Sequence, residues 1–428
     1  MEKPIEIEVG IMTAKDIRIT ELPESGTFLV HDVVIGKEFH WERKENQEFK
    51  GKYKILDENG EKTLVNILPL EDYLESVIAS EMASTSDLEF LKAHAVISRS
   101  WLLAQIGYCH PGPDLCHPGL DPGSPDSRRR LNQVDCFAIA IKSGMTEIKS
   151  AMTEIRSAMT DEPATDSFNE YIRWYDREDH ANFDVCADDH CQRYQGVSRI
   201  SSPLVTQAIR ETKGEVLMYE DRICDTRFSK CCGGKTETFE NTWGNESHPY
   251  LISINDQIGL GDDFCNTKDI TVLSQVLNNY DQETSDFYEW TVVYSQEQLS
   301  DLLERKTSFD FGRIVDLIPI ERGESGRIIR LKIVGTKQTK VIGKELFIRK
   351  ALSESHLYSS DFQVEKQFDS NSSEIPSGFI LSGKGWGHGV GLCQIGAAVM
   401  ATKGYSYQEI LKHYFPLSKL LKNYGQEE

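Results

Sequence analysis

The spacing of apolar residues changes at Pro69, and this change limits the fold more than any other feature of the sequence. From about residue 5 to residue 68, short runs such as Ile5-Glu6-Ile7-Glu8-Val9 alternate apolar and polar residues, which is typical of half-buried strands. Beyond Pro69, apolar residues recur at the spacing of one helical face, at Leu70, Leu74, Val77 and Ile78. Strand-rich sequence followed by helices predicts an α+β fold, with a mixed or antiparallel sheet core and packed helices.

The order of these signals divides the chain into four predicted segments. Residues 1–66 form a β-rich region, and residues 67–265 form the first part of a core of helices and strands. Residues 266–375 form a smaller α/β lobe, and residues 376–428 return to complete the core. Within the core, residues 109–165 are rich in turn formers and contain the near-duplicates MTEIKSA and MTEIRSA. We interpret this stretch as a loop insertion, because closure entropy grows only logarithmically with loop length.

Charge and hydropathy exclude two classes of interaction. The 428-residue chain has a formal net charge of −21 at pH 7. Nucleic-acid-binding proteins usually carry a basic patch, so no nucleic-acid partner is expected. No apolar run approaches the roughly 18 residues that can span a bilayer, so no transmembrane segment is expected. The opening sequence MEKPIEIEVG lacks the apolar region of a secretory signal peptide, and the sequence alone therefore indicates the cytoplasm.

Glu81 is the first candidate for chemistry. It lies on the apolar stripe of the helix that follows Pro69, seven residues after Leu74. A carboxyl group in that position should be partly desolvated, which raises its pKa and lets it hold a proton near neutral pH. Such a group can donate the proton in glycosidic bond cleavage. The alternative is that the helix ends near Glu81 and that the carboxylate faces water or pairs with a lysine.

The segment GKGWGHGVG, at residues 383–391, is the second candidate. Glycine occupies every odd position, and Trp386 and His388 are among the side chains at the even positions. In an extended chain, this pattern places all side chains on one face and leaves bare backbone on the other. A bare backbone lets a ligand approach closely, while Trp386 could stack on a sugar ring and His388 could form hydrogen bonds. The alternative is a tight structural turn with a buried tryptophan.

Cys186, His190 and Cys191 form a predicted metal site. Two thiols and an imidazole within six residues are the ligand types that zinc prefers, and ten cysteines in the whole chain are too few for a disulfide scaffold. Water, or a thiol of the turn Lys230-Cys231-Cys232, would be the fourth ligand. Two alternatives remain open, namely ordinary buried cysteines and a cysteine nucleophile at Cys191 or Cys393.

Arg99 is the last candidate that the residues themselves suggest. It lies in the apolar run AHAVISRSWLLA, and a guanidinium in such a helix must be paired. It could orient Glu81 or bind substrate. A structural ion pair inside the core is an equally good interpretation.

Four ordered blocks of the sequence resemble the stage II sporulation protein D (SpoIID) and amidase-enhancer family. They are Leu70-Glu71-Asp72-Tyr73-Leu74 with Ala79-Ser80-Glu81-Met82 and Leu91 to Trp101; Gln192-x-Tyr194-x-Gly196; Ala208 to Leu217 with Ser229-x-x-x-Gly233-Gly234-x-Thr236-Glu237; and Gly385 to Gly391 with Gln394. The blocks extend from about residue 67 to residue 416, and their order makes the resemblance more specific than any single block. The chain departs from the family pattern at Ala83, where proline is usual, and at Cys393, where serine is usual.

The resemblance implies a lytic transglycosylase that cleaves the linkage between N-acetylmuramic acid and N-acetylglucosamine in peptidoglycan strands without stem peptides. It maps the catalytic glutamate of the family onto Glu81, and we expect Arg99, Trp386, His388 and Gln394 to bind substrate. Zinc held by cysteine and histidine also occurs in the family, in the region of the predicted metal site. Other members enhance a cell-wall amidase, so the alternative is a non-catalytic glycan-binding partner of an amidase. The family also implies the cell envelope, which conflicts with the missing signal peptide.

Overall fold

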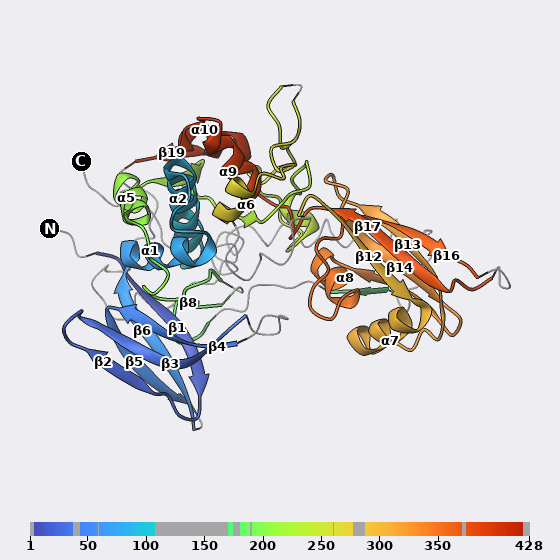
Figure 1. The fold of residues 1–428 in the computed structure, drawn as a ribbon, viewed down its shortest axis with the longest axis horizontal. Coiled ribbons are helices and arrows are strands. Elements are labelled where there is room, and N and C mark those ends of the chain that lie inside the picture. The colour runs from blue at the N-terminus through green and yellow to red at the C-terminus, as the bar shows by residue number, and fades with distance from the viewer. Residues whose placement is uncertain are drawn as a thin grey trace, which may run out of the picture.

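A computed structural model defines the fold of the chain (Figure 1). It describes residues 4–36, 43–58, 60–107, 170–173, 180–188, 191–259, 261–276, 287–369 and 374–422. Within these ranges the chain forms eight α-helices and several antiparallel or mixed sheets, none of them closed into a barrel. This arrangement confirms the predicted α+β class. The predicted loop insertion at residues 109–165 lies outside the described residues, and the four predicted segment boundaries stay a prediction.

Six strands in two sheets form the N-terminal region, as its alternating sequence predicts. They are β1 (Glu6–Ala14), β2 (Ile19–Leu22), β3 (Thr27–Ile35), β4 (Arg43–Lys50), β5 (Lys52–Glu58) and β6 (Glu61–Pro69). One sheet has the order β5-β6-β1-β8, in which β8 (Val185–Cys186) lies parallel to β1, and the other has the order β2-β3-β4. Ile7 and Val9 of β1 are fully buried, so the alternating apolar residues face the core.

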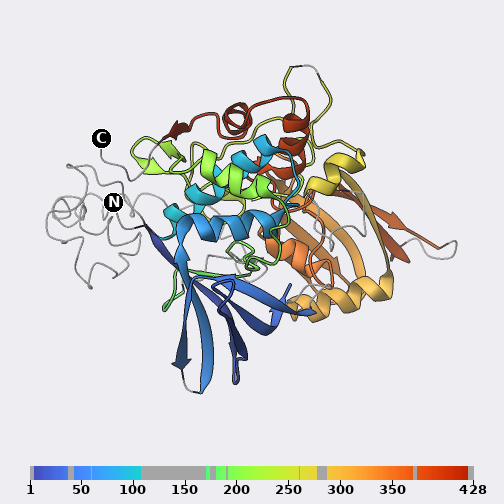
Figure 2. The same ribbon diagram turned by 60° about the vertical axis from the view of Figure 1, so that its left-hand side comes forward.

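Six helices lie above these strands (Figure 2). They are α1 (Leu70–Glu81), α2 (Leu88–Gln105), α5 (Pro203–Glu211), α6 (Ile270–Val276), α9 (Gln394–Thr402) and α10 (Tyr407–Tyr414). The central helix is α2, which contacts α1, α5, α9 and α10 and is buried along most of its length. Because α2 is apolar on more than one face, other helices surround it. No helix in the described part of the chain combines the length and the apolar character that crossing a membrane requires.

The end of the chain returns to this helical layer. The short strands β11 (Phe228–Ser229) and β18 (Leu392–Cys393) pair in parallel. A second small sheet has the order β10-β9-β19, formed by Arg222–Ile223, Val216–Tyr219 and Lys419–Leu421. A 3-10 helix, η2 (Phe239–Asn241), lies between these segments in sequence. Strands and helices far apart in the chain thus share one hydrophobic core, and we call this part the core body.

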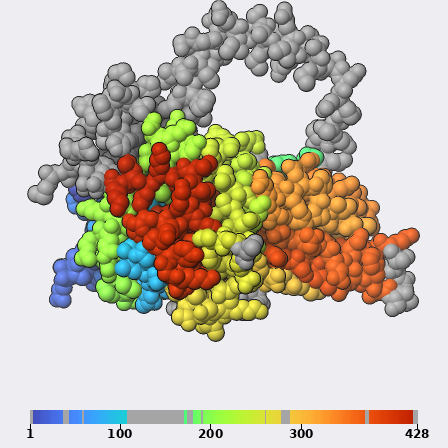
Figure 3. Space-filling view, turned by 90° about the horizontal axis from the view of Figure 1, so that it is seen from above, coloured from blue at the N-terminus to red at the C-terminus, as the bar shows by residue number. Residues whose placement is uncertain are grey.

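A second lobe has a hydrophobic core of its own and lies beside the core body (Figure 3). One of its sheets has the order β12-β17-β16, formed by Glu289–Ser295, Gly378–Lys384 and Phe362–Gln367. The other has the order β13-β14-β15-β7, formed by Ile314–Arg322, Ile328–Gly335, Thr339–Gly343 and Glu170–Ile172. Two helices, α7 (Gln296–Thr307) and α8 (Glu345–Ala351), complete the lobe. β13 and β14 pair in antiparallel register, and the short connection between them contains Gly323 and Gly326, residues typical of hairpin loops.

Arg327 joins the second lobe to the core body. Its guanidinium is 1% exposed and donates hydrogen bonds of 3.0 Å to the backbone carbonyls of Cys232 and Gly387. Close by, the hydroxyl of Ser325 donates to the carboxylate of Glu237 over 2.6 Å. The glycine-rich segment therefore lies at a buried polar junction between the two parts.

Candidate functional site

Glu81 is the last residue of α1 and is half-buried at the edge of the core body. Its Oε1 accepts a hydrogen bond of 3.0 Å from the backbone amide of Arg193. One residue earlier, Oγ of Ser80 accepts the amide of Gln195 over 3.1 Å. The helix does end at Glu81, as the alternative interpretation proposed, but the carboxylate is hydrogen-bonded and only partly exposed. These two amides fix the end of α1 against the chain that follows β8.

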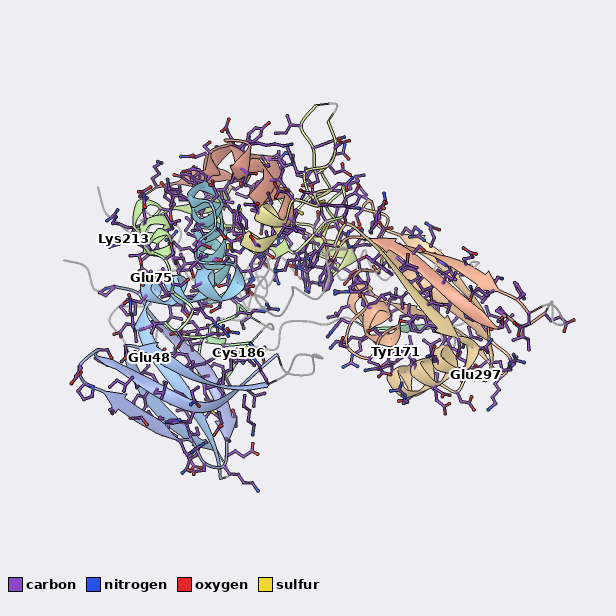
Figure 4. All side chains as sticks on the ribbon, viewed as in Figure 1. Glu48, Glu75, Tyr171, Cys186, Lys213 and Glu297 are labelled. Carbon is purple, nitrogen blue, oxygen red and sulfur yellow. The ribbon has the colours of Figure 1, made fainter. Side chains whose placement is uncertain are left out.

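Two thiols and an imidazole form a cluster on that same chain. His180, Cys186 and Cys191 each offer one ligand atom, and these atoms all lie within 4.8 Å of one another. Sγ of Cys191 lies 3.4 Å from Nε2 of His180. Cys186, labelled in Figure 4, belongs to β8, which pairs with β1 and so holds this thiol in place. The donor set suits zinc, and three protein ligands would leave a fourth position for water.

This cluster differs from the predicted metal site in its imidazole. The structure brings Cys186 and Cys191 together, as expected, but the histidine beside them is His180. His190 lies outside the described residues. Cys232, one of the thiols considered as a fourth ligand, belongs to a separate buried cluster. His180 precedes Cys186 by only six residues, and this spacing could have indicated it as a ligand. His190 is the more obvious candidate in the sequence because it is adjacent to Cys191.

Tyr73 shows that Glu81 and the thiol–imidazole cluster share one neighbourhood. Burial raises the pKa of Tyr73 well above its usual value, and the negative charges of Cys191, Tyr194, Cys186 and Glu81 raise it further. The chain itself links the two, because Cys191 lies two residues before Arg193, whose amide donates to Glu81. A cation bound to the cluster would therefore also act electrostatically on Glu81.

Arg99 belongs to α2, and its side chain contacts the first turn of α1, at the end opposite Glu81. Its guanidinium is 1% exposed and donates to both carboxylate oxygens of Glu71, over 2.7 and 3.2 Å, and to the carbonyl of Glu215 over 3.1 Å. At about 1.5 Å per residue, the helix rises about 15 Å from residue 71 to residue 81. The geometry favours a structural ion pair for Arg99 over contact with Glu81 or with substrate.

The glycine-rich segment is not extended, and this corrects the sequence-based expectation. β17 ends at Lys384. Four of the following residues have φ between 73° and 95°, namely Gly385, Gly387, Gly389 and Gly391. A Cβ on Gly391 would collide with the backbone carbonyl of Arg227. Glycine is needed here because the chain turns through left-handed conformations and packs closely against other segments, which occupy the face predicted to be bare.

His388 is held in this segment as a neutral imidazole. Its Nδ1 accepts the amide of Val390 over 3.0 Å, and its ring packs edge-on against Trp243 with centroids 4.5 Å apart. Burial lowers the pKa of His388 well below its usual value, and the positive charge of Arg227 lowers it further. Trp386 is half-buried and packs against the ring of Tyr358 in the second lobe. Both side chains are fixed at the junction, and their contact with sugar stays a prediction.

Gln394 lies inside the core body. It is 2% exposed, and its side-chain amide lies 3.1 Å from Nε2 of His94. Burial lowers the pKa of His94 to about 3, and the charge of Lys230 contributes to this shift. The neutral pair links α9 to α2, and its burial does not favour direct contact between Gln394 and a substrate.

A second cluster of ligand-type side chains was not predicted. Cys232, Asp256, Cys265 and Cys393 offer one atom each, all within 4.8 Å of one another. Burial raises the pKa of Asp256 well above its usual value, and the charge of Cys393 raises it further. For Cys393 itself, burial is outweighed by hydrogen bonds from Cys231, Cys232 and Cys265, which hold its pKa well below its usual value. Cys393 therefore packs among thiols, which does not favour its pairing with His388 as a nucleophile.

The fold and the site together define a class: an α+β protein in which a glutamate at a helix end lies beside a thiol–imidazole cluster. Residues 58–122 and 136–219 match the family described as stage II sporulation protein. This match includes α1 with Glu81 and the cluster. Residues 237–391 match a domain of unknown function, DUF8618. The second match includes the glycine-rich segment.

Several curated proteins are similar to this chain. An uncharacterized protein of Brachyspira hyodysenteriae is 25% identical over 86% of this chain and 71% of its own length. The amidase enhancer of Bacillus subtilis is 27% identical over 53% of this chain and 33% of its own length. Stage II sporulation protein D of Bacillus amyloliquefaciens is 26% identical over 49% of each chain. The chain thus spans a third to a half of these two relatives, and its similarity to the family of stage II sporulation protein D and the amidase enhancer is confirmed over these residues.

Proposed function

We propose that this chain cleaves the glycan strands of peptidoglycan as a lytic transglycosylase, with Glu81 as its acid and base. Similarity to this family supports a cell-wall-related role. The observation that carries the finer proposal is the position of Glu81. Its carboxylate is half-buried at the end of α1, oriented by the Arg193 amide, and close to the thiol–imidazole cluster. A carboxyl group that is fixed in this way and still partly exposed can reach a bound polymer.

One carboxyl group is enough for this reaction. Glu81 in its protonated form donates to the glycosidic oxygen as the bond from C1 of N-acetylmuramic acid to O4 of N-acetylglucosamine breaks. The resulting carboxylate then takes the proton of the muramic 6-hydroxyl, whose oxygen forms a new bond to C1. The product carries a 1,6-anhydro ring, Glu81 regains its proton, and no water is consumed. Two-carboxylate glycosidases need a second acidic residue, and this route does not.

The thiol–imidazole cluster would hold a zinc ion that supports this geometry. His180, Cys186 and Cys191 are the residues that would bind it. The ion would compensate the charge of the thiolates and would fix the chain that carries Arg193. The Arg193 amide then orients the Glu81 carboxylate and stabilises its ionised form after the first proton transfer.

The amidase enhancer of Bacillus subtilis supports a second candidate function. In this alternative the chain binds glycan strands without cleaving them and activates a separate cell-wall amidase. Position 81 would then tolerate substitution, because no proton transfer depends on it. The two candidates differ in whether new chain ends appear.

Incubation with denuded glycan strands, followed by mass spectrometry of the products, separates the candidates. The variants are Glu81→Gln and the control Glu75→Gln. Glu75 lies on the same helix, is half-buried and pairs with Lys50 over 3.1 Å, so its replacement removes a carboxylate of α1 outside the proposed site. We expect anhydro ends from the unsubstituted protein and from Glu75→Gln, and none from folded Glu81→Gln. Strand binding without new ends in all three proteins, with stimulation of an added amidase, would support the enhancer.

A further inference from the structure

Four ligand-type side chains converge next to the glycine-rich segment, and none of them belongs to the thiol–imidazole cluster. Cys232 follows β11, Asp256 and Cys265 lie on the chain before α6, and Cys393 is the last residue before α9. Their ligand atoms all lie within 4.8 Å of one another, and each residue is at most 1% exposed. These donors come from separate segments, and 161 positions separate Cys232 from Cys393.

The sulfur atoms are spaced for a shared ligand. Sγ of Cys232 lies 3.6 Å from Sγ of Cys265, and both cysteines are free. A disulfide would bring the sulfurs to about 2.05 Å. A tetrahedral zinc ion with Zn–S bonds of about 2.3 Å holds two sulfurs about 3.8 Å apart. The separation of 3.6 Å between the sulfur atoms of Cys232 and Cys265 is close to that of two zinc ligands and far from that of a disulfide.

Hydrogen bonds already orient these donors. Sγ of Cys393 accepts the backbone amide of Cys232 over 3.3 Å. Asp256 accepts the amide of Cys265 at Oδ2 and the hydroxyl of Tyr414 at Oδ1, both over 2.6 Å. Metal ligands are typically held by such outer partners, which fix the direction of the lone pairs. The cluster therefore has both the donors and the support that a metal site requires.

The cluster also lacks a counter-charge. Asp256 is fully buried and, within the part of the chain that the structure describes, it forms hydrogen bonds but no ion pair. An ionised carboxylate buried among thiols is costly unless a cation compensates its charge. A divalent ion bound by the same four groups would supply that compensation.

We propose that Cys232, Asp256, Cys265 and Cys393 bind a divalent ion of the zinc type in a closed, four-coordinate site. Complete burial leaves no position open to water, so this site is structural and not catalytic. The ion ties together the chain after β11, the chain before α6 and the start of α9. Trp386 of the glycine-rich segment pairs with the residue before Cys232, so the ion fixes the support of that segment. The proposal does not depend on the chemistry proposed for Glu81.

Zinc content tests the proposal when the first cluster has been removed. A full-length variant with both Cys186→Ser and Cys191→Ser lacks that cluster and serves as the background. Its zinc content is measured by inductively coupled plasma mass spectrometry. We expect about one zinc per chain in this background, and less than about a tenth after adding Cys265→Ser or Cys393→Ser. Cys231→Ser is the matched control, because this buried thiol neighbours the site but lies outside the proposed ligand set. It should retain the zinc.

A second measurement on the unsubstituted chain covers the case in which a variant does not fold. Iodoacetamide labelling is mapped by mass spectrometry before and after zinc removal with a chelator. Cys232, Cys265 and Cys393 should react at least about tenfold faster once zinc is gone. Labelling rates at these cysteines that the chelator leaves unchanged would overturn the proposal, as would a folded background protein without zinc. Zinc lost from Cys231→Ser but retained in Asp256→Asn would overturn the ligand set.

Discussion

Arg99 donates to both carboxylate oxygens of Glu71, over 2.7 and 3.2 Å, and so ties the middle of α2 to the first turn of α1. The side chain of Arg99 is 1% exposed and that of Glu71 is 27% exposed. Replacing Glu71 leaves a buried guanidinium without its carboxylate, which is costly in a protein core.

Glu71→Ala should lower the free energy of unfolding by about 2–3 kcal/mol, somewhat less than for a fully buried pair. The control is Asp72→Ala in the same helical turn, where the carboxylate is 42% exposed and lies 4.0 Å from Lys50. Such an exposed pair contributes less than about 1 kcal/mol. Urea unfolding at pH 7 measures both. Equal losses for the two variants would argue against a structural role for the Arg99 pair.

Glycine at position 391 should be required for packing and not only for backbone freedom. Gly391→Ala meets the carbonyl of Arg227, whereas Gly404→Ala has a similar positive φ and no atom within 4 Å. The left-handed backbone alone costs an alanine about 1–2 kcal/mol, and the collision adds about 1–3 kcal/mol. Thermal or urea unfolding of the two variants isolates the collision. Equal losses would mean that Arg227 moves aside without cost.

His94 should make the protein less stable as the pH falls. Its pKa is about 3 in the folded state and about 6.5 in the unfolded state. Between about pH 6 and pH 4 the unfolded state therefore binds one more proton at this residue, and stability decreases with falling pH by about 1.4 kcal/mol per unit. His94→Gln removes this contribution. Urea unfolding across that range should show a shallower pH dependence for the variant, and an unchanged slope would place His94 in a more hydrated setting.

The thiol–imidazole cluster should support activity through the position of Arg193. Cys191→Ser removes one ligand two residues before the amide that Glu81 accepts. We expect the release of anhydro products to fall by at least about 10- to 100-fold, because loss of even the outer partners of metal ligands has an effect of that size. Cys224→Ser is the control, because Cys224 is buried but belongs to neither cluster. Full activity in folded Cys191→Ser would show that the cluster does not support the reaction.

The parts of the fold that follow one simple period could be predicted from the sequence. The strands before Pro69 alternate because one face of each sheet is buried, as Ile7 and Val9 show, and α1 is amphipathic because it packs on the core. The glycine-rich segment could not be predicted in the same way. Its alternation looks like a strand, but four glycines with positive φ turn the chain, and residues from distant segments, such as Arg227 and Arg327, pack where side chains would lie.

The candidate site was predictable where its residues are close in sequence. The short spacing of Cys186 and Cys191 predicts that both belong to one site. His180 is brought beside them by the course of the chain that leads into β8. Arg99 was ambiguous because the sequence cannot say which carboxylate a buried guanidinium meets. The four-residue cluster around Cys393 was missed because the pairing of β11 with β18 assembles it from distant segments.

The position of Glu81 leads to the most direct test of the proposed reaction. The measurement is the rate at which purified Glu81→Gln releases 1,6-anhydro products from denuded glycan strands, compared with the unsubstituted protein and Glu75→Gln. Loss of a general acid and base should reduce the rate by about 10²- to 10⁴-fold, while circular dichroism and urea unfolding show an intact fold. Anhydro products released by Glu81→Gln at the unsubstituted rate would contradict the assignment of Glu81 as the acid and base.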